Sequence, residues 1–115
     1  DIEGNISWDR ALLANGKEYH RFQSTETKNG NVVIIGTSGR EVSRGYDEDA
    51  FMVRLDGNGN ILWSTSFGTY DNDDWGWSLF ETDTNDLVFI GSTKSYGASL
   101  FDIFLFGTNS EGISK

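Results

Sequence analysis

Short, unbroken runs of apolar residues alternate along this chain with clusters of polar turn residues. Three of the runs are Val32–Ile35, Leu87–Ile90 and Ile103–Phe106. A strand with one wet face alternates apolar and polar residues, whereas a strand buried on both faces is apolar throughout. The runs therefore predict short β-strands in small sheets that are packed between neighbouring sheets. Two further strands are predicted for Ile61–Phe67 and Trp75–Thr82.

The segments between these strands have the chemistry of hairpin turns. Lys28–Asn31, Asp56–Asn60 and Asp83–Asp86 are rich in Asn, Asp and Gly, which tolerate the positive φ that tight turns need. Proline is absent from the chain, so nothing in the sequence prevents these strands from pairing in mid-sheet. The pattern predicts an all-β protein.

The chain contains two copies of one sequence unit. The recurring blocks are Gly4–Trp8 with Gly59–Trp63, Asn31–Thr37 with Asp86–Ser92, and Asp49–Val53 with Asp102–Phe106. The first two pairs are 55 residues apart and the third is 53 apart, so the second copy is two residues shorter in the polar stretch before Asp102. A surface loop tolerates such a deletion. We take repeat 1 as about residues 4–58 and repeat 2 as about residues 59–112.

Repeated sheets of four strands, each buried on both faces, are typical of the blades of a β-propeller. The alternative is one eight-stranded sandwich or barrel built by duplication. The chain starts on a strand of the outermost type, Asn5–Leu13, contains one complete unit and stops after the third strand type. The predicted fold is therefore all-β, with two four-stranded antiparallel blades in residues 1–115 and one blade split between the N- and C-termini.

The segment Arg54–Gly68 resembles the repeats of bacterial and archaeal β-propellers of the pyrroloquinoline-quinone-dehydrogenase-like and SBBP (seven-bladed β-propeller) types. These repeats share a strand ending in Asp, a turn with Gly, an apolar pair, Trp and then Phe-Gly. An aliphatic strand ending in Gly and an Asp opening the next strand follow, and Ile90-Gly91 and Asp102 match them. The first copy departs from the pattern, because Asp9–Leu13 lacks the Phe-Gly ending. The resemblance covers nearly the whole chain and implies a propeller closed by a split blade, but no particular function.

Two blades cannot close a ring, which needs at least about four, and alone they would expose two large apolar faces. We therefore expect a homo-oligomer of about three to five chains, in which each chain lends its first strand to a neighbour's last blade. The alternative is that the chain is an excised or designed fragment. The repeat positions Trp8, Trp63, Gly36, Gly91, Asp49 and Asp102 are expected to have structural roles.

Composition narrows the classes of partner. The 115 residues carry 18 acidic and 9 basic side chains, a net charge of −9, which opposes binding to nucleic acid and to anionic membranes. No apolar run reaches the roughly 18 residues of a membrane-spanning helix, so we expect no membrane insertion. The chain has no Cys, which excludes disulfides and thiolate ligands. Acidity favours a secreted or cell-surface protein without deciding the compartment.

One acidic loop is a candidate metal site. Asp71, Asp73 and Asp74 place three carboxylates within four residues, and clustered carboxylates repel unless a cation or solvent screens them. An ordinary solvated loop is the leading interpretation, and a calcium site formed by these three carboxylates is the alternative. Asp56–Asn60 also has oxygens at positions one, three and five, but it lacks the Gly and Glu of a calcium loop. A hairpin turn explains that segment better.

Aromatic residues next to this loop suggest a second site. Tyr70 and Trp75 stand beside carboxylates, a combination that suits sugar recognition, so both are predicted to bind a ligand. Trp77 is assigned to the core. His20, the only histidine, aligns with Trp75 in the repeat and is expected to fill an aromatic position rather than act as a base. No cofactor besides calcium is expected, because nothing here supplies the quinone machinery of the resembled family.

No catalytic arrangement stands out. The Ser, His and Asp residues lack the Gly-x-Ser-x-Gly motif of a nucleophile elbow, and abundant acidic residues make any carboxylate pair uninformative. We therefore predict a protein that is not an enzyme: a propeller scaffold or interaction module whose partner is itself, with a glycan or a protein as further ligand. The alternatives are a lectin-like carbohydrate-binding propeller and an accessory domain of a secreted enzyme. The copies diverge in the loops Gly39–Val42 and Tyr96–Ser99, which favours a scaffold over repeated ligand sites.

Overall fold

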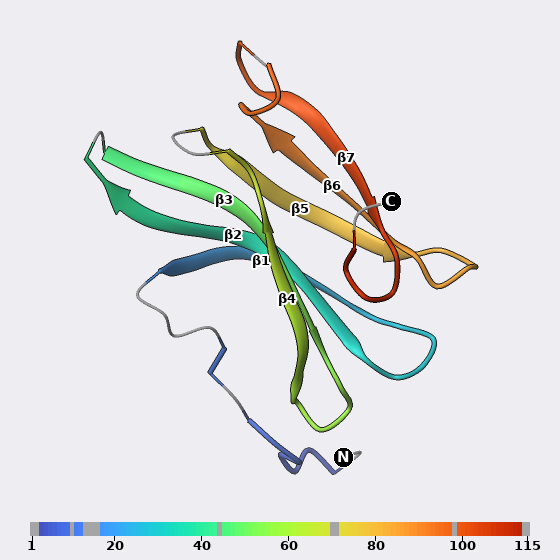
Figure 1. Cartoon of the computed structure of the whole chain (residues 1–115). Helices are drawn as coiled ribbons and strands as arrows, with labels where there is room; N and C mark the ends of the chain where they lie inside the picture. Colours follow the sequence, from blue (N-terminus) through green and yellow to red (C-terminus); the bar gives the residue numbers. More distant parts are fainter. Residues whose placement is uncertain are drawn as a thin grey trace.

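The computed structural model describes residues 3–9, 11–12, 17–43, 45–69, 72–97 and 99–113, and in these the chain forms seven strands and no helix. The strands are β1 (Glu18–Glu26), β2 (Val32–Val42), β3 (Gly45–Leu55), β4 (Ile61–Phe67), β5 (Asp74–Glu81), β6 (Leu87–Thr93) and β7 (Asp102–Thr108). They make two antiparallel sheets, one in the order β1-β2-β3-β4 and one in the order β5-β6-β7 (Figure 1). The prediction of an all-β fold is confirmed. A closed propeller is not seen in the described part of the chain.

The strands lie where the apolar runs and turn residues predict them. β5, β6 and β7 of the second sheet are the counterparts of β1, β2 and β3 of the first sheet in the repeat. Asp56–Asn60 is a hairpin turn, as predicted, because the Oδ1 atom of Asp56 accepts hydrogen bonds from the backbone N–H groups of Asn58 (2.8 Å) and Asn60 (2.9 Å). These bonds occupy the carboxylate with its own turn.

Each sheet has a β-bulge at the same place in the repeat. The β1–β2 register shifts between His20 and Gln23, and the β5–β6 register shifts between Gly76 and Ser78. Opposite the bulges stand the repeated glycines Gly36 and Gly91. A Cβ on Gly36 would lie 3.1 Å from the backbone oxygen of His20, and one on Gly91 would collide with the backbone of the strand opposite. The repeated glycines therefore allow the bulged strand to cross closely over its neighbour.

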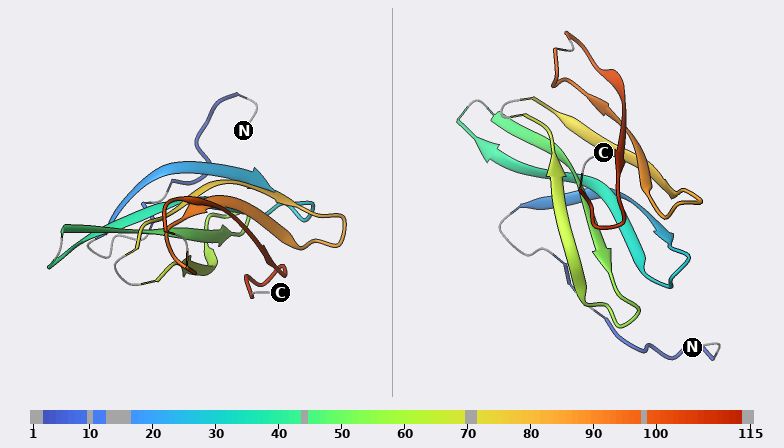
Figure 2. Two further views of the ribbon diagram at one scale, coloured as in Figure 1. Left: turned by 90° about the horizontal axis from the view of Figure 1, so that it is seen from above. Right: turned by 45° about the vertical axis from the view of Figure 1, so that its right-hand side comes forward.

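The core lies between the two sheets. Its buried residues are Val33, Ile35 and Met52 from the first sheet and Leu79, Leu87 and Phe89 from the second. Phe67 of β4 packs its ring at 4.8 Å from Phe89 and at 4.5 Å from Phe106. β5 is the strand of the second sheet that contacts β1, β2 and β3. Figure 2 shows the twist of both sheets from two further sides.

The apolar runs predict burial on both faces, and only part of this is seen within one chain. In β3 the residues from Ala50 to Leu55 are all buried. In β6 and β7, by contrast, Ile90 is 39% exposed, Leu105 66% and Ile103 86%. The outer face of the second sheet therefore carries the apolar residues of a buried strand without a cover from the described part of its own chain.

The predicted N-terminal strand, Asn5–Leu13, is not formed within the single chain. The described residues of this segment, 5–9 and 11–12, belong to no sheet. Trp8 contacts the turn between β3 and β4, and Leu12 lies beside Ile34 and Phe51 of the first sheet. A strand needs a neighbouring edge to satisfy its backbone donors and acceptors.

Candidate functional site

A group of charged and aromatic side chains joins the two sheets where β1 and β5 meet. Its centre is Glu48 of β3, whose side chain is 16% exposed. Nε2 of His20 lies 3.0 Å from one carboxylate oxygen of Glu48, and Nε1 of Trp75 donates a hydrogen bond to the other oxygen. His20 and Trp75 are the residues that align in the two repeats, so one carboxylate bonds both copies of this position. This explains His20 as a structural residue.

Arg21 completes this group through the aromatic rings. Its guanidinium carbon lies 4.6 Å from the ring centre of Trp75 and 5.9 Å from that of Trp77. Trp75 also stacks on Phe101 at 4.3 Å. Cation–π contacts and stacked rings of this kind hold side chains in fixed positions. We call His20, Arg21, Glu48, Trp75, Trp77 and Phe101 the Trp75 cluster.

Trp77 is not a core residue, so that prediction is wrong. Its side chain is 45% exposed, and its Nε1 donates a hydrogen bond to Oγ of Ser92 at 2.7 Å. The physical reason is the β-bulge, because Trp77 is the extra residue between Gly76 and Ser78 and has no counterpart in the β5–β6 register. Trp75, predicted to bind a ligand, has its polar nitrogen bonded to Glu48. Its predicted partner Tyr70 lies outside the described residues.

The carboxylates of the candidate calcium site interact with different partners. Asp74 is 2% exposed and accepts hydrogen bonds from Thr93 and, at 2.6 Å, from Ser95. Asp73 pairs instead with Nζ of Lys94 at 2.9 Å, and Asp71 lies outside the described residues. In the part of the chain that the structure describes, no three side chains of the His, Cys, Asp or Glu types are grouped as a metal would need.

Asp74 also faces the repeated residue Asp49. A Cβ on Gly68, between β4 and β5, would lie 2.4 Å from a carboxylate oxygen of Asp49 and 2.6 Å from one of Asp74, so no side chain fits there. Burial raises the pKa of the Asp49 carboxyl, the charge of Asp47 raises it further, and that of Asp74 adds to this. Asp102, the counterpart of Asp49 in the second repeat, is exposed. Asp49 thus meets the second sheet, whereas Asp102 meets solvent.

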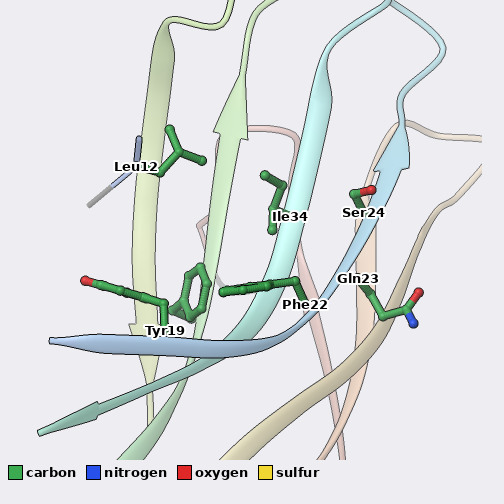
Figure 3. A pocket seen from close by; sticks show the side chains of 7 residues that line it. Leu12, Tyr19, Phe22, Gln23, Ser24 and Ile34 are labelled. Atoms are coloured by element: carbon green, nitrogen blue, oxygen red, sulfur yellow. The ribbon is translucent and has the colours of Figure 1, made fainter. Parts of the chain in front are cut away.

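A pocket opens on the outer face of the first sheet, away from the second sheet. Its volume is about 400 Å³, and it is lined by Leu12, Tyr19, Phe22, Gln23, Ser24, Ile34 and Phe51 (Figure 3). The ring of Phe51 is held edge-on by Tyr19 at 5.0 Å and by Phe22 at 6.1 Å. Five of the seven lining side chains are apolar or aromatic, so the pocket is suited to hydrophobic packing.

Two of the residues that line this pocket have counterparts in the second repeat. Ile34 and Phe51 correspond to Phe89 and Phe104 of the second repeat, 55 and 53 residues later. Phe89 belongs to the core, and Phe104 packs against it. The pocket is therefore built from the positions that, in the second sheet, face the first sheet. Sequence reasoning did not single out Tyr19 or Phe22, although alignment of the two repeats places Phe22 opposite Trp77.

The repeated tryptophans make equivalent contacts. Nε1 of Trp63 in β4 donates a hydrogen bond to the carbonyl oxygen of Ser110 at 3.2 Å, and a Cβ on Gly112 would meet its ring. Nε1 of Trp8 donates to the carbonyl oxygen of Gly57 at 3.0 Å, and a Cβ on Gly59 would meet its ring. Each tryptophan thus lies over the turn that follows the third strand of the sheet after it in the chain, β3 for Trp8 and β7 for Trp63.

No protein-family model matches this chain, and no curated protein matches it either. Among the described residues no helix is long and apolar enough to cross a membrane. The resemblance to propeller repeats accordingly stays a prediction drawn from the residues.

Proposed function

We propose that this chain is a two-blade unit of a β-propeller, and that it works as a non-catalytic scaffold assembled head to tail from several copies. In this proposal each sheet is one blade, and a ring of chains provides the surface on which a glycan or a protein ligand binds. The proposal rests on how the two copies of the repeat differ in burial.

The observation that carries the proposal is the exposure of equivalent positions. Met52 and Ala50 of the first sheet are 0% and 1% exposed. Both lie on the face of β3 that packs toward the second sheet. Their counterparts, 53 residues later, are Leu105 and Ile103, which are 66% and 86% exposed. Large apolar side chains that are exposed together on one face mark a surface that another molecule covers.

The opposite face of the molecule supplies the matching surface. The pocket on the first sheet contains Ile34 and Phe51, whose counterparts Phe89 and Phe104 receive the first sheet in the core. The packing of the first sheet on the second can therefore be repeated between two chains. In such a contact the outer face of the second sheet of one chain packs on the pocket face of the first sheet of the next chain. Such a contact is head to tail, and it makes a closed ring if the rotation between sheets closes.

The geometry gives less support to the lectin-like alternative. Trp75, the aromatic residue predicted to bind a sugar, is bonded to Glu48 and stacked on Phe101. Its role within the chain is to join the two sheets. Trp77 is the more accessible ring, and its counterpart Phe22 lines the pocket. Strong, multivalent binding on a glycan array would favour the lectin-like function over a scaffold.

The test is the solution mass by light scattering, for the natural chain and for two variants. We expect a discrete oligomer of about three to five chains. Leu105→Lys places a charge on the proposed interface and is expected to give monomers that keep the far-ultraviolet spectrum of the folded chain. Thr84→Lys adds the same charge to an exposed turn and is expected to leave the mass unchanged. A natural chain that is monomeric at micromolar concentration and unfolds cooperatively would contradict the assembly.

A further inference from the structure

We infer that the turn Thr27–Asn31 modifies itself: the side-chain amide of Asn29 is hydrolysed to a carboxylate, and this carboxylate becomes the counter-ion of Arg54. The reaction is the deamidation that Asn-Gly sequences undergo, and its co-reactant is water. Asn-Gly occurs at residues 15–16, 29–30 and 58–59, and the first of these pairs lies outside the described residues. The two other pairs stand in equivalent turns, so each serves as a reference for the other.

The two turns have the same backbone. In the turn between β1 and β2, the N–H of Gly30 donates a hydrogen bond to the carbonyl oxygen of Thr27 at 2.9 Å. In the turn between β3 and β4, the N–H of Gly59 donates to the carbonyl oxygen of Asp56 at 3.0 Å. The φ angle is 81° for Gly30 and 80° for Gly59, a conformation that glycine adopts without strain. The backbone therefore does not distinguish the two asparagines.

The side chains of the two asparagines have different surroundings. The hydroxyl of Thr27 donates a hydrogen bond to Oδ1 of Asn29 at 2.5 Å, and Nη2 of Arg54 donates to the same oxygen at 3.1 Å. Because a guanidinium has donors only, the atom that faces Arg54 is the oxygen of the amide and not its nitrogen. The side chain of Asn58, by contrast, has no hydrogen-bond partner among the described residues.

This placement favours the attack that begins deamidation. The backbone nitrogen of Gly30 gives up its proton to water, and its electron pair attacks Cγ of Asn29, which places a negative charge on Oδ1. The side-chain nitrogen takes up a proton from water and leaves as ammonia, so that a five-membered succinimide remains. Water then opens this ring and leaves an aspartate or an isoaspartate at the position. Donors about 2.7–3.1 Å from an oxygen that becomes charged stabilise the transition state, so Arg54 and Thr27 are expected to accelerate the attack.

Access to the attacking nitrogen also favours Asn29. A Cβ on Gly30 would meet nothing within 4 Å, whereas one on Gly59 would lie 2.5 Å from the ring of Trp8. In both turns the N–H of the glycine has to leave its carbonyl acceptor before it attacks. The tryptophan that covers Gly59 hinders this opening, and the turn that contains Gly30 has no such cover from the described part of the chain.

Arg54 gives the product a reason to be stable. This side chain is buried, with 4% exposed, and its guanidinium donates to the carbonyl oxygen of Ser110 at 2.8 Å, to the hydroxyl of Thr27 at 3.5 Å and to Oδ1 of Asn29. In the part of the chain that the structure describes, all three acceptors are neutral. A buried charge without a counter-ion is unfavourable. A carboxylate in the place of the Asn29 amide would supply that counter-ion.

The first test follows both asparagines in one sample of the folded chain. The chain is incubated at neutral pH, and peptide mapping by mass spectrometry separates each amide from its acid. We expect Asn29 to convert about tenfold faster than Asn58, which corresponds to about 1.4 kcal/mol of activation free energy. In urea both contacts are lost, so the two rates should become similar. Equal rates in the folded chain, or faster conversion of Asn58, would overturn the inference.

Three variants separate the effect of the donors from that of solvent access. Arg54→Met removes the guanidinium and should lower the ratio of the Asn29 rate to the Asn58 rate several-fold. Thr27→Val keeps the shape of the side chain, removes the other donor and should lower the ratio as well, which covers the case in which Arg54→Met does not fold. Lys28→Met is the control, because its Nζ faces Thr82 and Asp83, and it should leave the ratio unchanged. A ratio that neither Arg54→Met nor Thr27→Val lowers would overturn the role of the donors.

The stability of the product is measured on a variant that already carries the carboxylate. Asn29→Asp is expected to raise the midpoint of thermal unfolding by about 2–5 °C, because the new carboxylate pairs with Arg54. Asn58→Asp places the same charge in the matched turn, beside Asp56, and is expected to give no rise. An Asn29→Asp chain that unfolds at the same temperature as the natural chain, or below it, would overturn the pairing with Arg54.

Discussion

Met52 of β3 and Leu105 of β7 occupy the same position of the two repeats, yet Met52 is completely buried and Leu105 is 66% exposed. Local sequence does not account for the difference, because both residues stand in apolar strands and each pairs with an isoleucine of the preceding strand, Ile35 or Ile90. The difference is that the second sheet covers Met52, whereas no part of the described chain covers Leu105. Burial of Met52 therefore stabilises the single chain, whereas burial of Leu105 would require contact with another chain.

Alanine at these two positions should have different effects. Met52→Ala leaves a cavity in the core and is expected to lower the free energy of unfolding by about 2–5 kcal/mol at any chain concentration. Leu105→Ala is expected to have a small effect in dilute solution and a growing effect as chain concentration rises, because assembly stabilises the folded state by mass action. Thermal unfolding over a concentration series measures both. A Leu105→Ala effect that is independent of concentration would argue against the interface.

A methyl group on Gly76 should separate the sheets. Its Cβ would lie 2.7 Å from Cγ1 of Ile35 and 2.8 Å from the carbonyl oxygen of Gly36. Because backbone cannot move aside as a side chain does, Gly76→Ala is expected to lower stability by about 1–3 kcal/mol. The control is Gly107→Ala, where a Cβ meets nothing within 4 Å and where the first repeat has Arg54. Urea unfolding compares them, and equal effects would contradict the close contact.

Removing the charge of Glu48 should weaken the junction of the sheets. Its two carboxylate oxygens face His20 and Trp75. In Glu48→Gln an amide NH₂ group replaces one of these oxygens, so one of the two hydrogen bonds is lost. A hydrogen bond to a charged group is worth about 1.5–3 kcal/mol, so a loss of this order is expected in urea unfolding. Glu111→Gln, on an exposed turn, is the control. A loss no larger than the control's would mean that the Trp75 cluster contributes little to stability.

Asp49 should make stability depend on pH with a known sign. Its pKa is raised in the folded chain, first by burial and then by the charge of Asp47. The unfolded chain therefore gives up the proton more readily, and stability falls as pH rises through the raised pKa. Asp49→Asn removes this penalty, so the free energy of unfolding of the variant is expected to rise relative to that of the natural chain as pH increases from the ordinary aspartate pKa of 3.8 through the raised pKa of Asp49.

The measurement is urea unfolding of both chains at several pH values across this range. Asp102→Asn, at the exposed counterpart of Asp49, is the matched control and should show no such gain. If Asp49→Asn loses stability relative to the natural chain as pH rises, the carboxylate is stabilised by its surroundings and the assigned cause is wrong.

The amino-acid sequence by itself determined the strands, the hairpin turns and the repeat. These depend on neighbours along the chain: apolar runs such as Leu87–Ile90 favour strands, and Asp and Asn bond their own turn backbone. The sequence did not identify the accessible face of Trp77, because a β-bulge reverses the alternation on which such a prediction depends.

The tertiary structure alone decided which copy of each repeated position is buried. Met52 and Leu105 are chemically similar, and only the packing of one sheet on the other distinguishes them. The same holds for Glu48, which meets Trp75 across 27 residues of sequence, and for Trp8, which reaches Gly57 across 49. The physical reason is that local propensity acts over a few residues, whereas burial depends on which surfaces meet when the chain closes on itself.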